Sequence, residues 1–213
     1  MIEVTVIDYG VGNLLSVSRA LEHCGARVTV TSDAAIILNS VRVVLPGVGA
    51  FAEGMAALRA LGLDAVVRQV ATNGTPLLGI CLGMQMLFDE SEEFGLTTGL
   101  GLIPGRVVKI PAMTTTGKKH KIPHIGWNEL VVPETSGTRQ SVLLADVAHG
   151  EATYFVHSYM AEPTASGHRL VDCLYGGILI SAMVKRDNVV GCQFHPEKSG
   201  QVGLKILRRF LSQ

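Results

Sequence analysis

The chain has 213 residues, of which 47% are hydrophobic and 17% are charged. This length and composition predict a folded protein with a sizeable core, rather than a disordered chain. The 18 basic and 18 acidic residues cancel, which argues against nucleic acid as the main partner. No apolar run approaches the roughly 20 residues that span a membrane, and no basic leader follows Met1, so we expect a cytoplasmic protein without membrane association.

Four cysteines are widely spaced along the chain, at Cys24, Cys81, Cys173 and Cys192. They never form a Cys-x-x-Cys pair, so the spacing indicates neither a disulfide framework nor a zinc site. We therefore expect reduced thiols, no bound metal and no cofactor.

The first 90 residues alternate between short apolar runs and segments with helical periodicity. Expected strands cover 4–7, 27–30, 41–45 and 76–80, and expected helices cover 14–24, 34–38, 51–61, 63–72 and 82–89. This alternation predicts parallel strands covered by helices. Gly10 and Gly12 follow the first strand, but Leu15 occupies the third glycine position of a dinucleotide-binding fingerprint, so we reject that interpretation.

After Asp89 the helical periodicity fades and turn-rich segments separate short apolar runs. Expected strands cover 106–110, 129–132, 152–156, 169–174, 177–184 and 189–194, and a last helix covers 199–211. No linker or internal repeat interrupts the chain, so we expect a single domain over residues 1–213. The segments 111–121 and 133–140 match no motif and are interpreted as variable loops.

Cys81 lies where the apolar strand 76–80 turns into the next helix. Gly79 and Gly83 flank it as Gly-x-Cys-x-Gly, which is the cysteine counterpart of a nucleophile elbow. Such a turn forces a strained backbone on its central residue and places the sulfur over the start of the following helix, where free N–H groups favour a thiolate. A buried structural cysteine is the alternative, but the two glycines favour a nucleophile.

A base for this nucleophile is expected at His195, in the sequence His195-Pro196-Glu197. A residue before proline is extended, and residues i and i+2 of an extended chain point to the same side. Glu197 is therefore positioned to orient the imidazole. Alone, the motif is equally consistent with a structural histidine before a helix. Together with Cys81, it predicts a triad of Cys81, His195 and Glu197.

A glycine-rich loop follows the strand 41–45, in the order Pro46-Gly47-Val48-Gly49. Loops at the carboxyl ends of strands form the sites of open α/β sheets, and the glycines allow backbone N–H groups to turn toward an anion. Taken by itself, the loop is better explained as a tight strand-to-helix turn.

The combination of Gly79-Ile80-Cys81-Leu82-Gly83 and Phe194-His195-Pro196-Glu197 resembles the triad-type, class I glutamine amidotransferases. Further segments are similar to the glutaminase subunits of imidazole glycerol phosphate synthases. They are 8–13, 45–51, 124–128 (His-Ile-Gly-Trp-Asn), 154–159 (Tyr-Phe-Val-His-Ser-Tyr) and 195–199. The match extends from the start of the chain to its end.

The resemblance implies a flavodoxin-like, mostly parallel sheet flanked by helices, with additional short strands in the C-terminal half. It implies that the chain hydrolyses glutamine and passes ammonia to a cyclase subunit with a (β/α)₈ barrel, as a heterodimer in histidine biosynthesis. The implied roles are as follows: nucleophile, acid/base and orienting residue at Cys81, His195 and Glu197; oxyanion hole at Val48, Gly49 and Leu82; glutamine binding at Gln85, Glu93, Ser158 and Tyr159; partner interface at Asn13, Trp127, Tyr154 and Lys198.

The two glycines of the Pro46–Gly49 loop also suggest a switch, in which the Val48 N–H points into the site only when the partner and its ligand are bound. Three alternatives stay open at this point. The triad serves a different ammonia acceptor, or it belongs to a cysteine hydrolase that needs no partner, or the chain is an interaction module with a vestigial site.

Overall fold

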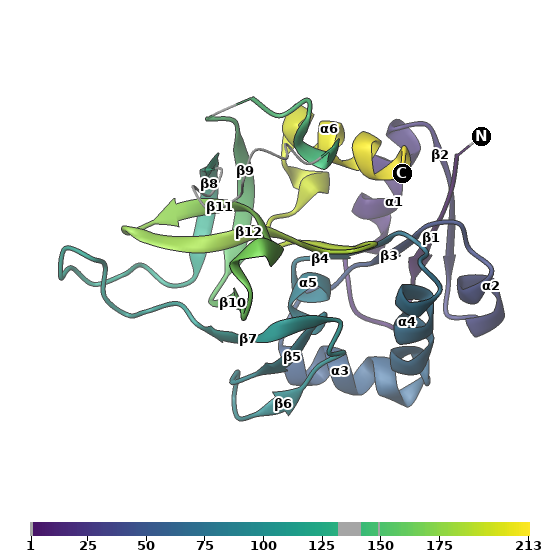
Figure 1. The fold of residues 1–213 in the computed structure, drawn as a ribbon, viewed down its shortest axis with the longest axis horizontal. Coiled ribbons are helices and arrows are strands. Elements are labelled where there is room, and N and C mark those ends of the chain that lie inside the picture. The colour runs from purple at the N-terminus through teal and green to yellow at the C-terminus, as the bar shows by residue number, and fades with distance from the viewer. Residues whose placement is uncertain (1, 132–141, 149) are drawn as a thin grey trace.

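The computed structural model describes residues 2–131, 142–148 and 150–213, and in it helices cover both faces of a nine-stranded sheet (Figure 1). The segment 133–140, interpreted above as a variable loop, lies outside the described residues. Among the described residues, no helix is long and apolar enough to cross a membrane.

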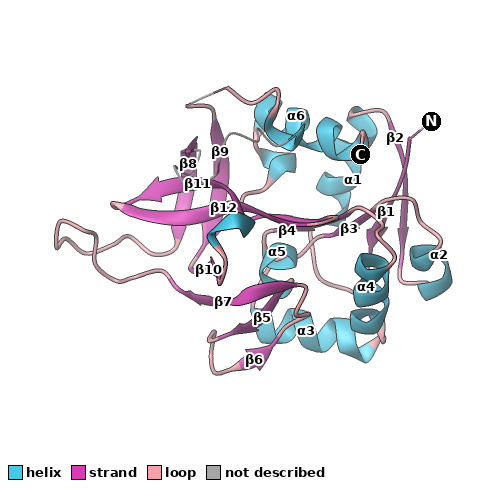
Figure 2. Cartoon of the chain, in the orientation of Figure 1, coloured by secondary structure: helices cyan, strands magenta, loops and turns pink. Residues whose placement is uncertain are grey.

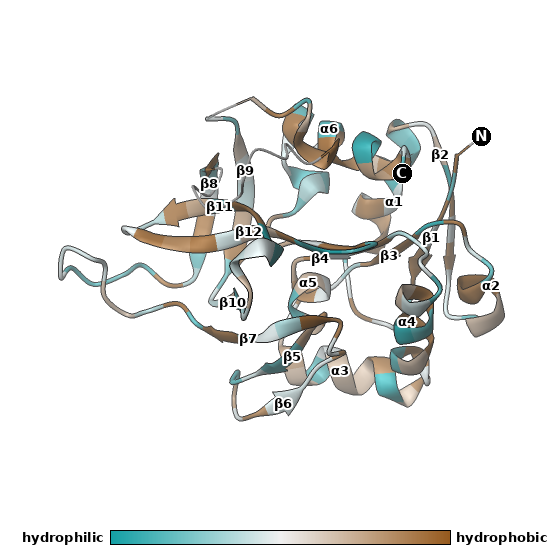
Figure 3. Ribbon diagram, in the orientation of Figure 1, coloured by the Kyte–Doolittle hydropathy of each residue, from teal (hydrophilic) through white to brown (hydrophobic). Residues whose placement is uncertain are grey.

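Five parallel strands form one half of the large sheet. They are β1 (Ile2–Ile7), β2 (Ala26–Thr31), β3 (Val43–Leu45), β4 (Leu77–Ile80) and β13 (Val189–Cys192), in the spatial order β2-β1-β3-β4-β13. This is the 2-1-3-4-5 order of flavodoxin-like sheets, so the predicted α/β class is confirmed. β3, β4 and β13 are short, apolar and buried along their whole length because both of their faces are covered, whereas the edge strand β2 is partly exposed. Figure 3 shows hydrophobic, brown stretches along the middle of the sheet.

Four antiparallel strands extend the same sheet beyond β13. They are β12 (Ile178–Arg186), β11 (Arg169–Tyr175), β8 (His124–Val131) and β9 (Ala152–His157). Figure 2 shows this strand-rich half at the opposite end of the molecule from β1 and β2. The strands expected at 129–132, 152–156, 169–174 and 177–184 therefore continue the main sheet, whereas the strand expected at 106–110 belongs to a second sheet. β8 begins five residues before the strand expected at 129–132.

A second, four-stranded sheet has the order β10-β7-β5-β6, with β10 at Tyr159–Pro163, β7 at Ile103–Lys109, β5 at Phe88–Ser91 and β6 at Thr97–Thr98. The helix expected over 82–89 is wrong in its second half, since α5 (Leu82–Met86) ends early and β5 follows. The carbonyl of Leu87 accepts from the amides of Leu102 and Ile103. This pairing with a distant segment replaces the hydrogen bonds that would have continued the helix.

The helices form one layer on each side of the sheet (Figure 1). One layer contains α1 (Leu14–His23) and α6 (Gly200–Leu211). The other contains α2 (Ala34–Leu38), α3 (Phe51–Ala60), α4 (Leu63–Thr72) and α5. Three 3₁₀ turns, η1 (Val142–Leu144), η2 (Ser166–His168) and η3 (Pro196–Lys198), complete the described elements. Asp33 caps α2, because its carboxylate accepts from the Ala35 and Ile36 amides at 2.8 and 3.1 Å.

Candidate active site

Cys81 lies between β4 and α5 with φ 54° and ψ −108°. Positive φ at a non-glycine residue is strained, at a cost of order 1–3 kcal/mol. Hydrogen bonds hold this conformation: the Cys81 amide donates to the Cys192 carbonyl at 2.8 Å, and the Cys81 carbonyl accepts from the Gln85 amide at 3.1 Å. The elbow expected from the Gly-x-Cys-x-Gly spacing is therefore present.

The glycines on either side of Cys81 allow three backbone segments to meet. A Cβ atom added to Gly79 would lie 2.7 Å from the Gly83 carbonyl oxygen, and one added to Gly83 would lie 1.9 Å from the Leu45 carbonyl oxygen. Real Cβ atoms do not approach backbone so closely. Glycine is thus required at both positions by packing, as the sequence predicts.

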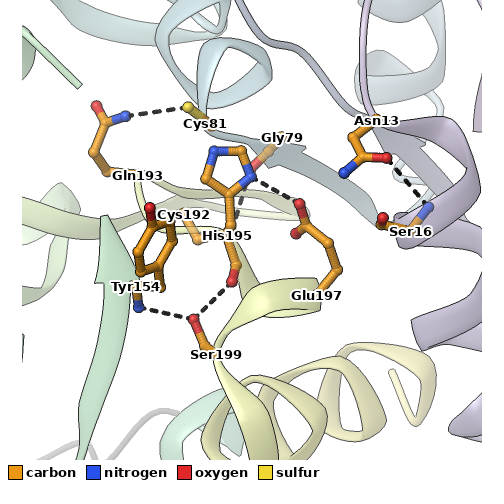
Figure 4. A network of polar contacts seen from close by, with 10 residues as sticks. All are labelled: Asn13, Ser16, Gly79, Cys81, Tyr154, Cys192, Gln193, His195, Glu197 and Ser199. Carbon is orange, nitrogen blue, oxygen red and sulfur yellow. Dashed lines mark hydrogen bonds and ion pairs between the residues drawn. The ribbon is translucent and has the colours of Figure 1, made fainter. Parts of the chain in front are cut away.

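His195 and Glu197 form a buried pair next to the elbow (Figure 4). The Nδ1 atom of His195 lies 2.7 Å from Oε1 of Glu197, and the two side chains are 2% and 1% exposed. Figure 4 shows the other ring nitrogen, Nε2, on the side of the ring nearer the Cys81 sulfur. This atom is buried and has no hydrogen-bond partner within the described part of the chain. It is the nitrogen that a general acid or base would use.

Main-chain contacts hold the imidazole in place. The His195 amide donates to the Tyr154 carbonyl at 3.0 Å, and its carbonyl accepts from the Ser199 hydroxyl oxygen at 2.6 Å. The Ser199 oxygen in turn accepts from the Tyr154 amide at 3.0 Å. The start of η3 is thus fastened to β9 (Figure 4).

The charge state of His195 follows from opposing effects. Burial lowers the pKa of His195, but Cys81 and the Glu197 carboxylate favour the charged ring and together raise the pKa to about 10. The imidazolium is therefore the stable form at neutral pH. A positively charged ring beside the sulfur favours a thiolate nucleophile.

One cavity of about 280 Å³ collects most of the residues that the sequence assigns to the site. Its volume suits a small metabolite. The assigned residues in its lining are Val48, Gly49, Cys81, Leu82, Gln85, Glu93, Ser158, Tyr159 and His195. Glu197 lies behind His195 and reaches the cavity only through the imidazole.

Two polar residues of the lining are anchored by hydrogen bonds. The Glu93 carboxylate accepts from the Phe51 amide at 2.7 Å, at the first residue of α3, where a negative charge is favoured. The Gln85 amide nitrogen donates to the Tyr159 carbonyl at 3.1 Å. The Glu93 carboxylate is therefore held at the start of α3 by a backbone hydrogen bond.

The glycine-rich loop packs directly on the elbow. The Leu82 amide donates to the Gly47 carbonyl at 3.3 Å, and the Tyr9 hydroxyl donates to the Pro46 carbonyl at 2.7 Å. Burial, reinforced by nearby Cys81, raises the pKa of Tyr9, so this hydroxyl keeps its proton. One predicted oxyanion donor, the Leu82 N–H, is thus engaged by the chain's own carbonyl in this structure.

The four residues expected at a partner interface lie outside the lining of the cavity. Trp127 and Tyr154 face each other across β8 and β9, with ring centroids 6.2 Å apart, and Trp127 is 59% exposed. Lys198 is exposed in η3. Asn13 caps α1, because its side chain accepts a 3.4 Å hydrogen bond from the Ser16 amide.

The sequence reasoning missed Gln193, whose amide donates to the Cys81 sulfur at 3.8 Å. It also gave no individual role to Pro123, Val156 or His157, although all three line the cavity. Alternation along an extended chain was the available signal, because Gln193 precedes His195 by two residues. Among the described residues, no group of three or more His, Cys, Asp or Glu side chains is arranged to hold a metal ion.

The close approach at the elbow gives a direct test. The substitution Gly83→Ala places a methyl group against the Leu45 carbonyl, so we expect the free energy of unfolding to fall by about 1–3 kcal/mol. Gly167→Ala is the matched control, because no atom lies within 4 Å of a Cβ there, and it should stay within about 0.5 kcal/mol of the wild type. Urea unfolding measures both, and equal stabilities would contradict the packing.

Comparison with known proteins identifies the family of the chain. The family described as glutamine amidotransferase class-I matches residues 5–213. An imidazole glycerol phosphate synthase subunit HisH 1 from Legionella pneumophila (strain Lens) is 50% identical, over 99% of this chain and 99% of that protein. The HisH subunit from Geobacillus sp. (strain WCH70) is 48% identical, over 98% of this chain and 96% of that protein.

Solved structures give the same fold. The structure of PurLQS from Thermotoga maritima matches with a TM-score of 0.71 and 20% identity, over 99% of this chain and 97% of the matched chain. The chain therefore belongs to the class-I glutamine amidotransferase family and, within it, to the group of imidazole glycerol phosphate synthase HisH subunits.

Proposed function

We propose that Cys81, His195 and Glu197 are the catalytic triad with which this chain hydrolyses glutamine to glutamate and ammonia. The observation that carries the proposal is the buried His195–Glu197 bond of 2.7 Å, with the second ring nitrogen free beside a strained cysteine. Family membership supports the choice of substrate.

The reaction proceeds in two halves on these residues. The Cys81 thiolate attacks the carboxamide carbon of glutamine, and His195 donates a proton to the departing nitrogen, so that ammonia leaves and a thioester remains. His195 then accepts a proton from water, which attacks the thioester and releases glutamate. Glu197 holds the ring in orientation through Nδ1 and stabilises its positive charge.

Backbone amides of Leu82, Val48 and Gly49 hold the oxyanion in this scheme, and removing one such donor in another enzyme costs roughly 2.7–4 kcal/mol. Gln85, Glu93, Ser158 and Tyr159 hold the substrate. The Glu93 carboxylate complements the positively charged amino group of glutamine.

The ammonia goes to a cyclase partner, with which the chain forms a heterodimer and makes imidazole glycerol phosphate and an aminoimidazole carboxamide ribonucleotide. This proposal is supported by HisH relatives of about 50% identity that are named as subunits of imidazole glycerol phosphate synthase. The partner's (β/α)₈ barrel is implied by the family resemblance. Asn13, Trp127, Tyr154 and Lys198 contact that partner.

A glutamine analogue with an electrophilic ketone tests the nucleophile. We expect a covalent adduct, found by intact-mass measurement and mapped by peptide analysis to Cys81, and no adduct with Cys81→Ala. Cys24→Ala is the control, since Cys24 is partly exposed and does not line the cavity, and this variant should keep the adduct. A wild-type chain that stays unmodified even with the cyclase present would refute an enzymatic role.

The engaged Leu82 amide predicts low activity of the isolated chain. An N–H that already donates to Gly47 cannot stabilise an oxyanion until the 46–49 loop rearranges. Glutamine hydrolysis should therefore rise strongly when the cyclase and its ligand are added, as measured by glutamate release. Full activity of the chain alone would rule out the switch.

The pH dependence tests Glu197. Because the pKa of His195 is raised to about 10, its charged form persists well above pH 6.5. The contribution of this charged form to folding stability is lost as the pH rises through about 10. Glu197→Gln removes one of the interactions that raise this pKa. The alkaline limb of kcat/KM, measured with the partner present, should move to lower pH, and an unmoved limb would contradict the assignment.

A further inference from the structure

The Cys81 sulfur has a second polar neighbour besides His195. The Nε2 atom of Gln193 donates to it at 3.8 Å (Figure 4), from a side chain with no exposed surface. The backbone of Gln193 is fixed, since its main-chain N–H donates to the Ala182 carbonyl at 2.9 Å. A buried amide N–H directed at sulfur stabilises the thiolate more than the neutral thiol.

The orientation of the Gln193 side-chain amide follows from a main-chain acceptor, the Tyr159 carbonyl, which is two hydrogen bonds away. The Tyr159 carbonyl can only accept, so Gln85 must present its nitrogen to it, at 3.1 Å. The same nitrogen lies 3.0 Å from Oε1 of Gln193. The oxygen of Gln193 is therefore committed to Gln85, and its nitrogen is left to face the sulfur.

The same carbonyl also accepts from a second donor. Nδ1 of His157 lies 2.8 Å from the Tyr159 oxygen, so Nδ1 carries the hydrogen and Nε2 of the neutral ring accepts. Nδ1 of His124 lies 3.0 Å from that Nε2 and must donate. Nε2 of His124 is then an acceptor for the Asn128 amide nitrogen, 3.5 Å away.

An independent contact at the far end requires the same assignment. The Asn128 amide nitrogen also donates to the Leu174 carbonyl at 3.0 Å. Nitrogen, and not oxygen, therefore faces His124, as the reasoning from Tyr159 demands. The His124 ring is stacked on Phe155 and on Tyr175, with centroids 4.9 and 3.9 Å apart, which leaves it little freedom to rotate.

The His124 and His157 rings are both neutral in this arrangement, because a second proton on either ring would place one N–H group opposite another. Burial, and to a lesser extent the neighbouring His120, lowers the pKa of His124 to about 4. Burial also lowers the pKa of His157 to about 3, with the Tyr159 carbonyl opposing and His124 and His195 reinforcing the change. The direction of each hydrogen bond is thus kept throughout the neutral pH range.

We propose that Gln193 is a further catalytic residue that stabilises and aims the Cys81 thiolate, and that His157 is a positioning residue that acts through it. His157 and Gln85 hold the Tyr159 carbonyl from two sides, and that carbonyl sets the direction of the Gln193 amide. The proposal rests on the proposed function, in which Cys81 is the nucleophile. In this arrangement, a chain of hydrogen bonds connects residues of β8 and β9 with the Cys81 sulfur.

The test measures alkylation of Cys81 by iodoacetamide as a function of pH, with peptide mapping to separate it from the other cysteines. Gln193→Met removes the N–H at similar volume, and we expect alkylation at neutral pH to slow about tenfold. Gln193→Glu should slow alkylation further, since a carboxylate then faces the sulfur. His195, Tyr9 and Cys192 also act electrostatically with Cys81, and they are unchanged in all variants.

Thr153→Val is the matched control. Thr153 is a buried polar residue on the same strand as His157, and its hydroxyl makes no hydrogen bond to any residue that the structure describes. Its alkylation profile should match the wild type. If Thr153→Val changed the profile as much as Gln193→Met, the loss of any buried polar group would perturb the elbow, and the proposal would be overturned.

The positioning role is tested by non-additivity. His157→Leu should shift the profile in the same direction as Gln193→Met but less, and His157→Asn, which keeps an N–H near the Tyr159 carbonyl, should recover part of the shift. The double variant Gln193→Met/His157→Leu should match Gln193→Met alone. Additive shifts would show that His157 does not act through Gln193.

Turnover separates this proposal from the proposed function. With the cyclase present, Gln193→Met should lower kcat about tenfold and change KM for glutamine less than about threefold, as for loss of an interaction with the nucleophile. If wild-type Cys81 forms no adduct with the glutamine analogue, the proposed function fails. If the adduct forms and neither Gln193 variant shifts the alkylation profile, only the present inference fails.

Discussion

The parallel pairing of β4 with β13 is the constraint on which the site depends. Ile80 lies opposite Cys192 in this register, and the Cys81 amide continues the ladder to the Cys192 carbonyl. The residues that follow the two strands therefore emerge side by side at one edge of the sheet. Cys81 comes from one strand end, and Gln193 and His195 come from the other, 112 positions later in the case of Gln193. Placing reactive groups at adjacent carboxyl ends is the general advantage of a parallel sheet.

The surroundings raise the pKa of one buried imidazole and lower the pKa of two others. Near Cys81 and Glu197 the pKa of His195 is raised, despite burial, because its charge has partners. Burial lowers the pKa values of His124 and His157, and the Tyr159 carbonyl only partly opposes this change at His157. The same side chain thus serves as an acid/base group in one place and as a neutral link in another.

Much of this arrangement could be predicted from the sequence, for local reasons. The elbow at Cys81 follows from two glycines, and the orientation of His195 with Glu197 follows from an extended His-Pro-Glu segment. The short strand β5 could not be predicted, because an apolar run after Gly83 fits a helix equally well until its partner β7 is known. The chain of amides and imidazoles could not be predicted either, because its members come from α5, β8, β9 and the residue that follows β13, and no sequence spacing relates these segments.

The acceptor at the middle of that chain is a peptide oxygen, and every amino acid carries one. Replacing the side chain at position 159 changes the wall of the cavity, but it leaves the oxygen that His157 and Gln85 share. Substitutions at position 159 can therefore change what the cavity binds, while the directions of the hydrogen bonds around this oxygen stay the same. At Tyr159, the side chain contributes to selectivity and the carbonyl oxygen contributes to reactivity. A substitution at this position changes only the side-chain contribution.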